Sequence, residues 1–246
     1  MTDRRVLISL LLLPLVACHI KEDRSACPCF LRIGLREAPG PVSLHLLAPG
    51  FQASCQAGKD TVMVVPVPRG EVRLVAVSGA QIQPGQPLQI PGGEDCPPVY
   101  LFSEPIQTHG DSLAVSIRLH KHFCTLRLEL DGVPGWGPPY QARVRGRVDG
   151  LDLDGTPSGG PFSCQLDIGS PIRLPRQAPE EELWLDIVMS DKVLRSFALG
   201  SYLLEAGYDW TAPDLEDLSL RMRLSVTSLL LQMDAWHKVI PLNLEI

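Results

Sequence analysis

The sequence predicts an all-β protein made of two comparable halves, and two observations carry this prediction. Apolar and polar residues alternate over many short runs, which is the pattern of a strand with one face in a core and the other in water. Clusters of proline and glycine, of which the chain has 23 and 21, separate these runs as turns do. Many short strands with turn signals between them are typical of β-sandwiches and β-barrels.

The expected strands and turns follow one another along the chain. The alternation is clearest in residues 31–36, 42–47, 113–120 and 124–131. Turns rich in proline and glycine are expected at residues 38–41, 66–70, 84–91 and 132–139. A break near residues 120–122 divides the mature chain into two domains, 27–120 and 121–246, each of ordinary domain size. Because no low-complexity linker separates them, we expect the two domains to pack end to end.

The segment 214–238 contains neither glycine nor proline and fits two templates. Its apolar residues alternate over 218–226, as in a strand, but an apolar stripe behind a cap at Asp214 also fits a helix. A strand is favoured because it places Arg221 and Arg223 together on one solvent-exposed face.

The first residues have the order of an export signal. Arg4 and Arg5 precede an apolar run that is too short to span a bilayer, and small residues then lead to Cys18. This end resembles the lipobox of bacterial lipoproteins, which implies a signal peptide over 1–17, acyl chains on Cys18 and a tether over 18–26. Stable anchoring requires more than one acyl chain, and a lipidated cysteine carries two or three. An ordinary signal peptide with a chance cysteine is the alternative.

Charge and cysteine content narrow the class of protein. A net charge of −6 and a pI near 5.5 argue against a nucleic-acid partner, which would require a basic face. An exported chain can form disulfides. Six cysteines remain besides Cys18, and they allow 15 pairings among which the sequence does not distinguish. These six are Cys27, Cys29, Cys55, Cys96, Cys124 and Cys164.

Two groups of residues have the composition of metal ligands. His120, His122 and Cys124 have the spacing of one strand face, which would suit zinc or copper, although a fourth ligand is not evident. The same face continues as leucines, so these residues also suit the entry of a strand into a core. The aspartates of 149–155 resemble part of a calcium loop but lack its final acid, and a turn between two strands explains them equally. No cofactor is expected.

A basic stripe on one expected strand also has two interpretations. Arg143, Arg145 and Arg147 alternate with apolar residues and glycine, as in a solvated edge strand whose charges discourage pairing. A patch that faces a binding partner is the alternative. The sequence has no nucleophile elbow, phosphate-binding loop or zinc-protease motif, so we do not expect an enzyme.

Three features together resemble a known family. They are the lipobox at Cys18, a Cys27-Pro28 step before the first strand, and the turn 207–210 (Gly-Tyr-Asp-Trp) followed by strands and Trp236. The chain is similar to the fimbrillin-associated (minor fimbrium) anchor lipoproteins of Gram-negative anaerobes. The resemblance implies two tandem transthyretin-like β-sandwich domains, export to the outer face of the outer membrane, and a role at the base of a fimbrium in attaching it and limiting its length.

The resemblance also implies a fimbrial stalk subunit as partner. Such fibres grow by β-strand addition, in which one chain completes the sheet of the next. The last residues alternate up to the end of the chain, and the candidates for this contact are Ile240, Leu242, Leu244 and Ile246. A final core strand explains the same alternation.

A surface glycan-binding lipoprotein of a nutrient-uptake complex is the rival function. Proteins of that kind display exposed aromatic side chains to sugars. The candidate platforms are Trp136, Trp184 and Trp210.

Overall fold

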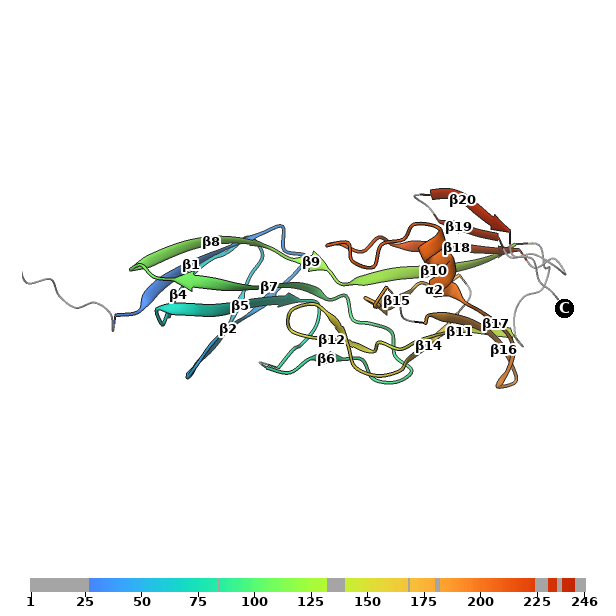
Figure 1. Ribbon diagram of the computed structural model, residues 1–246, viewed down its shortest axis with the longest axis horizontal. Helices are drawn as coiled ribbons and strands as arrows, with labels where there is room; N and C mark the ends of the chain where they lie inside the picture. The colour runs from blue at the N-terminus through green and yellow to red at the C-terminus, as the bar shows by residue number, and fades with distance from the viewer. Residues whose placement is uncertain are drawn as a thin grey trace, which may run out of the picture.

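The computed structural model describes residues 27–83, 85–131, 140–167, 169–179, 182–223, 230–233 and 236–241. Over these residues the chain is almost entirely β-structure, with a single short helix, as the alternation predicts. The strands form an elongated body in which the first half of the chain occupies one end and the second half the other (Figure 1). No described helix is long and apolar enough to cross a bilayer.

The first half is a sandwich of two sheets. Its strands are β1 (Cys29–Arg36), β2 (Val42–Ala48), β3 (Phe51–Ala57), β4 (Val62–Val67), β5 (Gly70–Ser78), β7 (Tyr100–Thr108), β8 (Ser112–Arg118) and β9 (His120–Lys121). One sheet has the order β4-β1-β8 and the other β3-β2-β5-β7-β9. In the smaller sheet β1 is antiparallel to β4 and parallel to β8.

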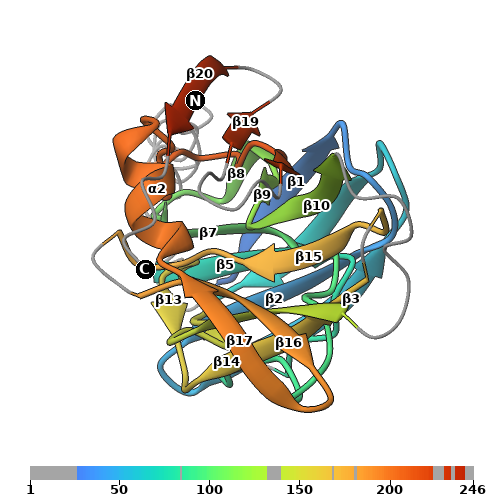
Figure 2. The ribbon, with the colours of Figure 1, turned by 90° about the vertical axis from the view of Figure 1, so that its right-hand side faces the viewer.

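The second half repeats this plan. Its elements are β10 (Phe123–Asp131), β11 (Tyr140–Gly146), β14 (Phe162–Leu166), β15 (Ile172–Pro175), β16 (Trp184–Met189), β17 (Lys192–Phe197), α2 (Leu199–Glu205), β18 (Leu218–Arg223), β19 (Leu230–Met233) and β20 (Trp236–Pro241). The sheets are β15-β10-β18 and β14-β11-β16-β17, and β19 pairs with β20. Seen end-on, the sheet of β10 and β15 lies above that of β14, β16 and β17 (Figure 2).

The two halves share one topology. In each, the first strand lies in the middle of a three-stranded sheet, antiparallel to one neighbour and parallel to the last sandwich strand. The facing sheet has the order β3-β2-β5-β7 in the first half, with β9 added at its edge, and the corresponding order β14-β11-β16-β17 in the second half. This repetition confirms the predicted all-β fold of two tandem sandwiches.

The alternation explains which side chains form the cores. In β1, Leu31 and Ile33 are fully buried, whereas Phe30 and Arg32 point outward and are exposed. One core cluster contains only residues from 29 to 119. The other draws on residues 75–101 as well as 123–220. The second core is therefore completed by side chains from the first half.

The excursion, defined here as residues 79–99 between β5 and β7, supplies most of that contribution. Its strand β6 (Leu88–Gln89) pairs with β12 (Gly150–Leu151), which in turn pairs with β13 (Pro157–Ser158). The amide of Ile90 also donates to the carbonyl of Asp149 at 2.8 Å. The two halves thus share a three-stranded sheet. The domain boundary at 120/121 stays a prediction. The two halves are joined by the pairing of β6 with β12 as well as by the covalent chain.

One glycine allows the two ends of the excursion to lie close together, and another allows the excursion to lie against the second half. A Cβ at Gly79, which has a φ of +80°, would stand 1.9 Å from the carbonyl oxygen of Pro98. A Cβ at Gly150 would stand 2.2 Å from the carbonyl oxygen of Leu88. Neither distance is sterically possible, so the backbone must shift to accept any other residue.

Other sequence expectations fare differently. The strand favoured for the start of 214–238 is confirmed as β18. The aspartate-rich segment 149–155 forms β12 and a turn, rather than a turn alone. The helix α2 was not expected, because its seven residues are too few for a clear periodic pattern. The helix follows β17 in the chain, contacts β16, and buries Leu199 and Leu203.

Candidate functional site

The residues predicted to bind the membrane and the stalk subunit lie mostly outside the described part of the chain. Cys18, Leu242, Leu244 and Ile246 are all outside it. The backbone of Ile240 pairs with Leu231 in the β19–β20 hairpin. Within the described residues, β19 contacts β18, and β20 is hydrogen-bonded to β19 alone. The described end of the chain therefore places β20 at a sheet edge.

The candidate metal ligands do not converge. Cys124 is fully buried in the second core, where burial raises the pKa of its thiol to about 12. His120 and His122 lie near the junction of the halves, and the Nδ1 of His120 is 3.3 Å from Asp214. Among the described residues, no group of three or more histidine, cysteine or acidic side chains could hold a metal ion. Cys124 therefore has the position expected of a residue where a strand enters a core, which is the alternative to metal binding.

The six remaining cysteines are all free thiols in this structure. Cys96, like Cys124, is fully buried in the second core, and its pKa is raised to about 12, chiefly by burial. A thiol with such a pKa is protonated at neutral pH and is a poor nucleophile. Neither side chain has the properties of a reactive cysteine.

The junction cleft, a hollow of about 390 Å³, lies where the two halves meet. β7 of the first half contributes Phe102 and Glu104 to its walls, and the second half contributes Arg176 and Trp210. His122, which lies between β9 and β10 where the chain passes from one half to the other, also lines the cleft. The cleft therefore depends on the relative placement of the two sandwiches.

Arg176 is the main polar group in the wall of this cleft. Its side chain is only 6% exposed, and its guanidinium donates to the carbonyl oxygens of Trp210 and of Pro213, the latter at 3.1 Å. It also donates to Nδ1 of His122 at 3.2 Å. Burial, followed by the charge of Arg176, lowers the pKa of His122 to about 4. His122 is therefore neutral at physiological pH and accepts this hydrogen bond.

Two aspartates in the segment that precedes β18 form hydrogen bonds with residues 121–125, where the chain enters the second half. Asp214 accepts from the amide of Lys121 at 2.8 Å. Asp217 accepts from the ammonium of Lys121 at 2.6 Å and from the amide of Thr125 at 2.7 Å. The side chains of Asp214 and Asp217 are 41% and 59% exposed, so solvent screening reduces what each of these contacts contributes to stability. Arg176 and these carboxylates hold the junction in one geometry.

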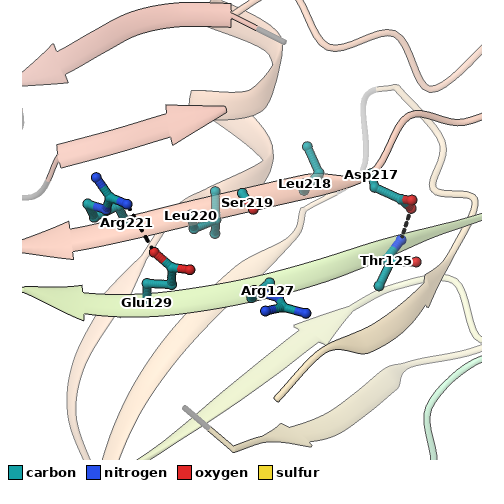
Figure 3. A pocket seen from close by; sticks show the side chains of 8 residues that line it. All are labelled: Thr125, Arg127, Glu129, Asp217, Leu218, Ser219, Leu220 and Arg221. Atoms are coloured by element: carbon teal, nitrogen blue, oxygen red, sulfur yellow. Dashed lines mark hydrogen bonds and ion pairs between the residues drawn. The ribbon is translucent and has the colours of Figure 1, made fainter. Parts of the chain in front are cut away.

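A second hollow, of about 400 Å³, lies on the polar face of β10 and β18 (Figure 3). Arg127 and Glu129 of β10 lie along it beside Ser219 and Arg221 of β18, and Arg221 donates to Glu129 at 3.1 Å. Alternation along two parallel strands produces this polar face. Its charges are mixed in sign, so it has the character of a solvated sheet face.

The structure corrects one interpretation of the basic stripe. β11, which carries Arg143 and Arg145, lies between β14 and β16 and is not an edge strand, and Arg147 lies just after its end. Defence of an open edge therefore does not account for these arginines.

The three tryptophans considered as sugar platforms also differ. Trp136 lies outside the described residues, and Trp210 is only 3% exposed, so it does not offer a platform. Trp184 is partly exposed, and it lies opposite Arg145 in the pairing of β11 with β16.

Sequence reasoning missed Arg176, Asp186 and Asp214. For Asp186 a signal existed, because it is the single charged residue in the otherwise apolar strand β16. A lone carboxylate in such a run indicates a buried polar contact. Arg176 and Asp214 lie in irregular segments, where no periodic pattern indicates that their side chains bind backbone groups at the junction.

Comparison with known proteins gives matches at the level of structure only. No family of proteins matches the sequence, and no curated protein matches it.

Several solved structures share the fold along most of the chain. A Bacteroides thetaiotaomicron protein provisionally described as polysaccharide-binding superposes with a TM-score of 0.67 at 13% identity, covering 86% of this chain and 98% of that one. A provisional adhesin of the same species gives 0.63 at 12% identity, covering 88% and 99%. The fimbrial anchor protein Mfa2 of Porphyromonas gingivalis gives 0.59 at 11% identity, covering 80% and 91%. At these identities the likeness establishes the fold.

Proposed function

We propose that this chain is an outer-membrane lipoprotein, exposed at the cell surface through acyl chains on Cys18, that serves as an anchor or accessory subunit of a fimbrium. The observation that carries the proposal is the tandem pair of sandwiches joined by a shared sheet. The same fold extends over most of the length of a fimbrial anchor protein and an adhesin-like protein. An elongated, braced body tethered at its first mature residue suits a mechanical, non-catalytic role.

The proposed contact with the fimbrium is β-strand addition of a stalk subunit at the C-terminal end. β20 lies at the edge of its hairpin, and the predicted alternation continues from Ile240 through Leu242 and Leu244 to Ile246. Backbone hydrogen bonds along such an edge provide affinity, and alternate side chains set the register. Capture of the first stalk subunit by a tethered chain attaches the fibre and limits its length.

The membrane part of the proposal is tested by Cys18→Ala. The variant should lose the mass of the acyl chains and move from the membrane to the soluble fraction. Cys55→Ala is the matched control, because it removes another cysteine and should leave the protein in the membrane. Recovery of Cys18→Ala in the membrane fraction would contradict lipid anchoring at this position.

The fimbrial part is tested separately. A chain shortened by residues 242–246 should remain folded and exported but lose the capture of fimbrial subunits from the same cell in a pull-down. Cells that carry Cys18→Ala should shed longer fimbriae into the medium, measured by electron microscopy. Unchanged capture by the shortened chain would rule out strand addition at this end.

A surface glycan-binding lipoprotein is the second candidate function. One structural neighbour is provisionally described as polysaccharide-binding, and Trp184 is partly exposed beside Arg145. Parallel pull-downs with glycans and with fimbrial subunits discriminate between the two candidates.

A further inference from the structure

The arginine groove is a hollow of about 440 Å³ on the outer face of the sheet β14-β11-β16-β17. The residues that line it and carry the argument are Arg143, Arg145, Arg147, Ser163, Glu182 and Trp184. Three of the chain's 22 basic residues thus gather in one concave place on a protein whose net charge is −6. This local excess of arginine runs against the charge of the whole chain.

Strand register brings the basic stripe and the tryptophan together. In the sheet, Arg145 stands opposite Ser163 of β14 on one side and Trp184 of β16 on the other. The guanidinium carbon of Arg145 lies 5.1 Å from the centroid of the Trp184 ring, within the range of a cation–π contact. A cation and a flat aromatic surface that are 39 residues apart in sequence therefore form one site.

Asp186 holds two of the arginines in place from beneath. Its side chain is only 1% exposed, and it accepts from Arg143 at 3.1 Å and from Arg145 at 2.9 Å. Ser196 donates to its other oxygen at 2.7 Å. Burial alone would raise the pKa of Asp186, but these hydrogen bonds outweigh it and lower the pKa. An ionised carboxylate therefore fixes two guanidinium groups whose side chains remain 41% and 43% exposed.

The groove also contains an unused donor. The Nε of Arg143 is buried, and no hydrogen-bond partner for it is present among the described residues. Buried polar groups without partners are rare in folded proteins, and each calls for an acceptor such as water or a ligand. The exposed parts of the Arg143 and Arg145 guanidinium groups can donate positively charged N–H groups to an acceptor in the groove.

We propose that the arginine groove binds an acidic polysaccharide, with the apolar face of a sugar ring on Trp184 and the ring's carboxylate or sulfate on Arg143 and Arg145. Guanidinium groups match the planar, bidentate geometry of such anions. Tryptophan supplies the apolar surface that a sugar ring can cover. Arg143 and Arg145 share the single carboxylate of Asp186, so this pair of guanidinium groups keeps a net positive charge. The inference deepens the second candidate function and does not depend on the fimbrial role.

The test measures binding of the intact chain, held on a sensor surface, to three polymers. Polygalacturonate carries carboxylates, dextran sulfate carries sulfates, and dextran is neutral. We expect binding of one or both acidic polymers and at least tenfold weaker binding of dextran. The acidic polymer that binds more tightly identifies the anion.

Substitutions then locate the site. Arg145→Gln and Trp184→Ala should each raise the Kd for the preferred polymer at least tenfold. Arg127→Gln is the matched control, since it removes an exposed arginine from the other sheet of the same half, and it should leave the Kd unchanged. Glu182→Gln should lower the Kd two- to fivefold, because it removes a repelling charge from an exposed position. Thermal unfolding of each variant shows that the fold is retained.

The outcomes of these experiments distinguish a failure of the arginine-groove proposal from a failure of the glycan-binding function. Binding of neutral dextran as tightly as the acidic polymers, with groove variants unaffected, would overturn the groove but support glycan binding. Absence of binding to all three polymers overturns both. Binding of vesicles rich in anionic lipid in preference to the acidic polymers, lost in Arg145→Gln, would overturn the polysaccharide as occupant.

Discussion

The excursion predicts an asymmetry between the two halves when they are separated at residue 120/121. The first core contains only residues 29–119, so a chain of residues 27–120 should fold alone. The second core includes excursion side chains that a chain of residues 121–246 would lack. We therefore expect the first half to unfold cooperatively and the second half to be unfolded in isolation.

The magnitude follows from the buried side chains that are removed. Ile82, Leu88, Ile90 and Val99 are exposed by 8%, 8%, 4% and 0%, and all belong to the second core cluster. Full burial of an aliphatic side chain contributes about 1.5–3 kcal/mol, so the four contribute at most roughly 6–12 kcal/mol. Domains are stable by only about 5–15 kcal/mol in total. Loss of the excursion therefore removes most or all of the stability of the second half.

Urea unfolding followed by circular dichroism measures the effect. The comparison includes four proteins. They are the intact chain, residues 27–120, residues 121–246, and residues 121–246 preceded by residues 79–99 through a flexible linker. The fused excursion should restore a cooperative transition to the second half. If residues 121–246 alone unfold cooperatively at the same urea concentration as the intact chain, the excursion is not part of that core.

Three further predictions concern single residues. Gly150→Ala should destabilise the chain by about 1–3 kcal/mol in urea unfolding, because its Cβ would overlap the carbonyl oxygen of Leu88; an unchanged midpoint would mean that the shared sheet yields freely. Arg176→Met should cost at least about 2 kcal/mol by leaving buried carbonyls unpaired, and NMR titration should show the pKa of His122 rising from about 4 toward its ordinary value. Because that pKa is lowered by folding, stability of the parent chain falls as the pH drops from about 6.5 to 4, and a variant with unchanged acid sensitivity would exclude this histidine as a cause. Asp186→Asn should cost about 1–2 kcal/mol at pH 7 and nothing at a pH below the lowered pKa of Asp186, since a carboxylate with a depressed pKa stabilises only above that value; an equal cost at both pH values would show that its charge is irrelevant.

Strand identity was predictable because it depends on local alternation. Residues 31–36 and 124–131 fall within β1 and β10, and alternate side chains from Leu31 to Leu35 and from Cys124 to Leu128 are buried in the cores. Alternation reports which face is buried but not which strands become neighbours. The basic stripe shows the consequence, since the alternation that includes Arg143 and Arg145 has the same pattern on an edge strand as on the interior strand β11.

The candidate site could not be read from the sequence for the same reason. Arg145 and Trp184 were both noted as surface features, but their contact depends on the register of β11 with β16. The excursion was hidden by its composition, because residues 84–91 are rich in proline and glycine and have the pattern of a turn. Its apolar side chains, Leu88 and Ile90, are too few to display a period and are buried by the other half of the chain.

The shared sheet has a mechanical consequence for the proposed role between a membrane and a fibre. β1 begins near one end of the body, and the β19–β20 hairpin lies at the other (Figure 1). Without the excursion, tension between these ends would pass through the single crossing of the chain at residues 119–122. With it, the pairing of β6 with β12 must also break before the sandwiches can separate. We therefore expect the shared sheet to resist bending where the two sandwiches meet.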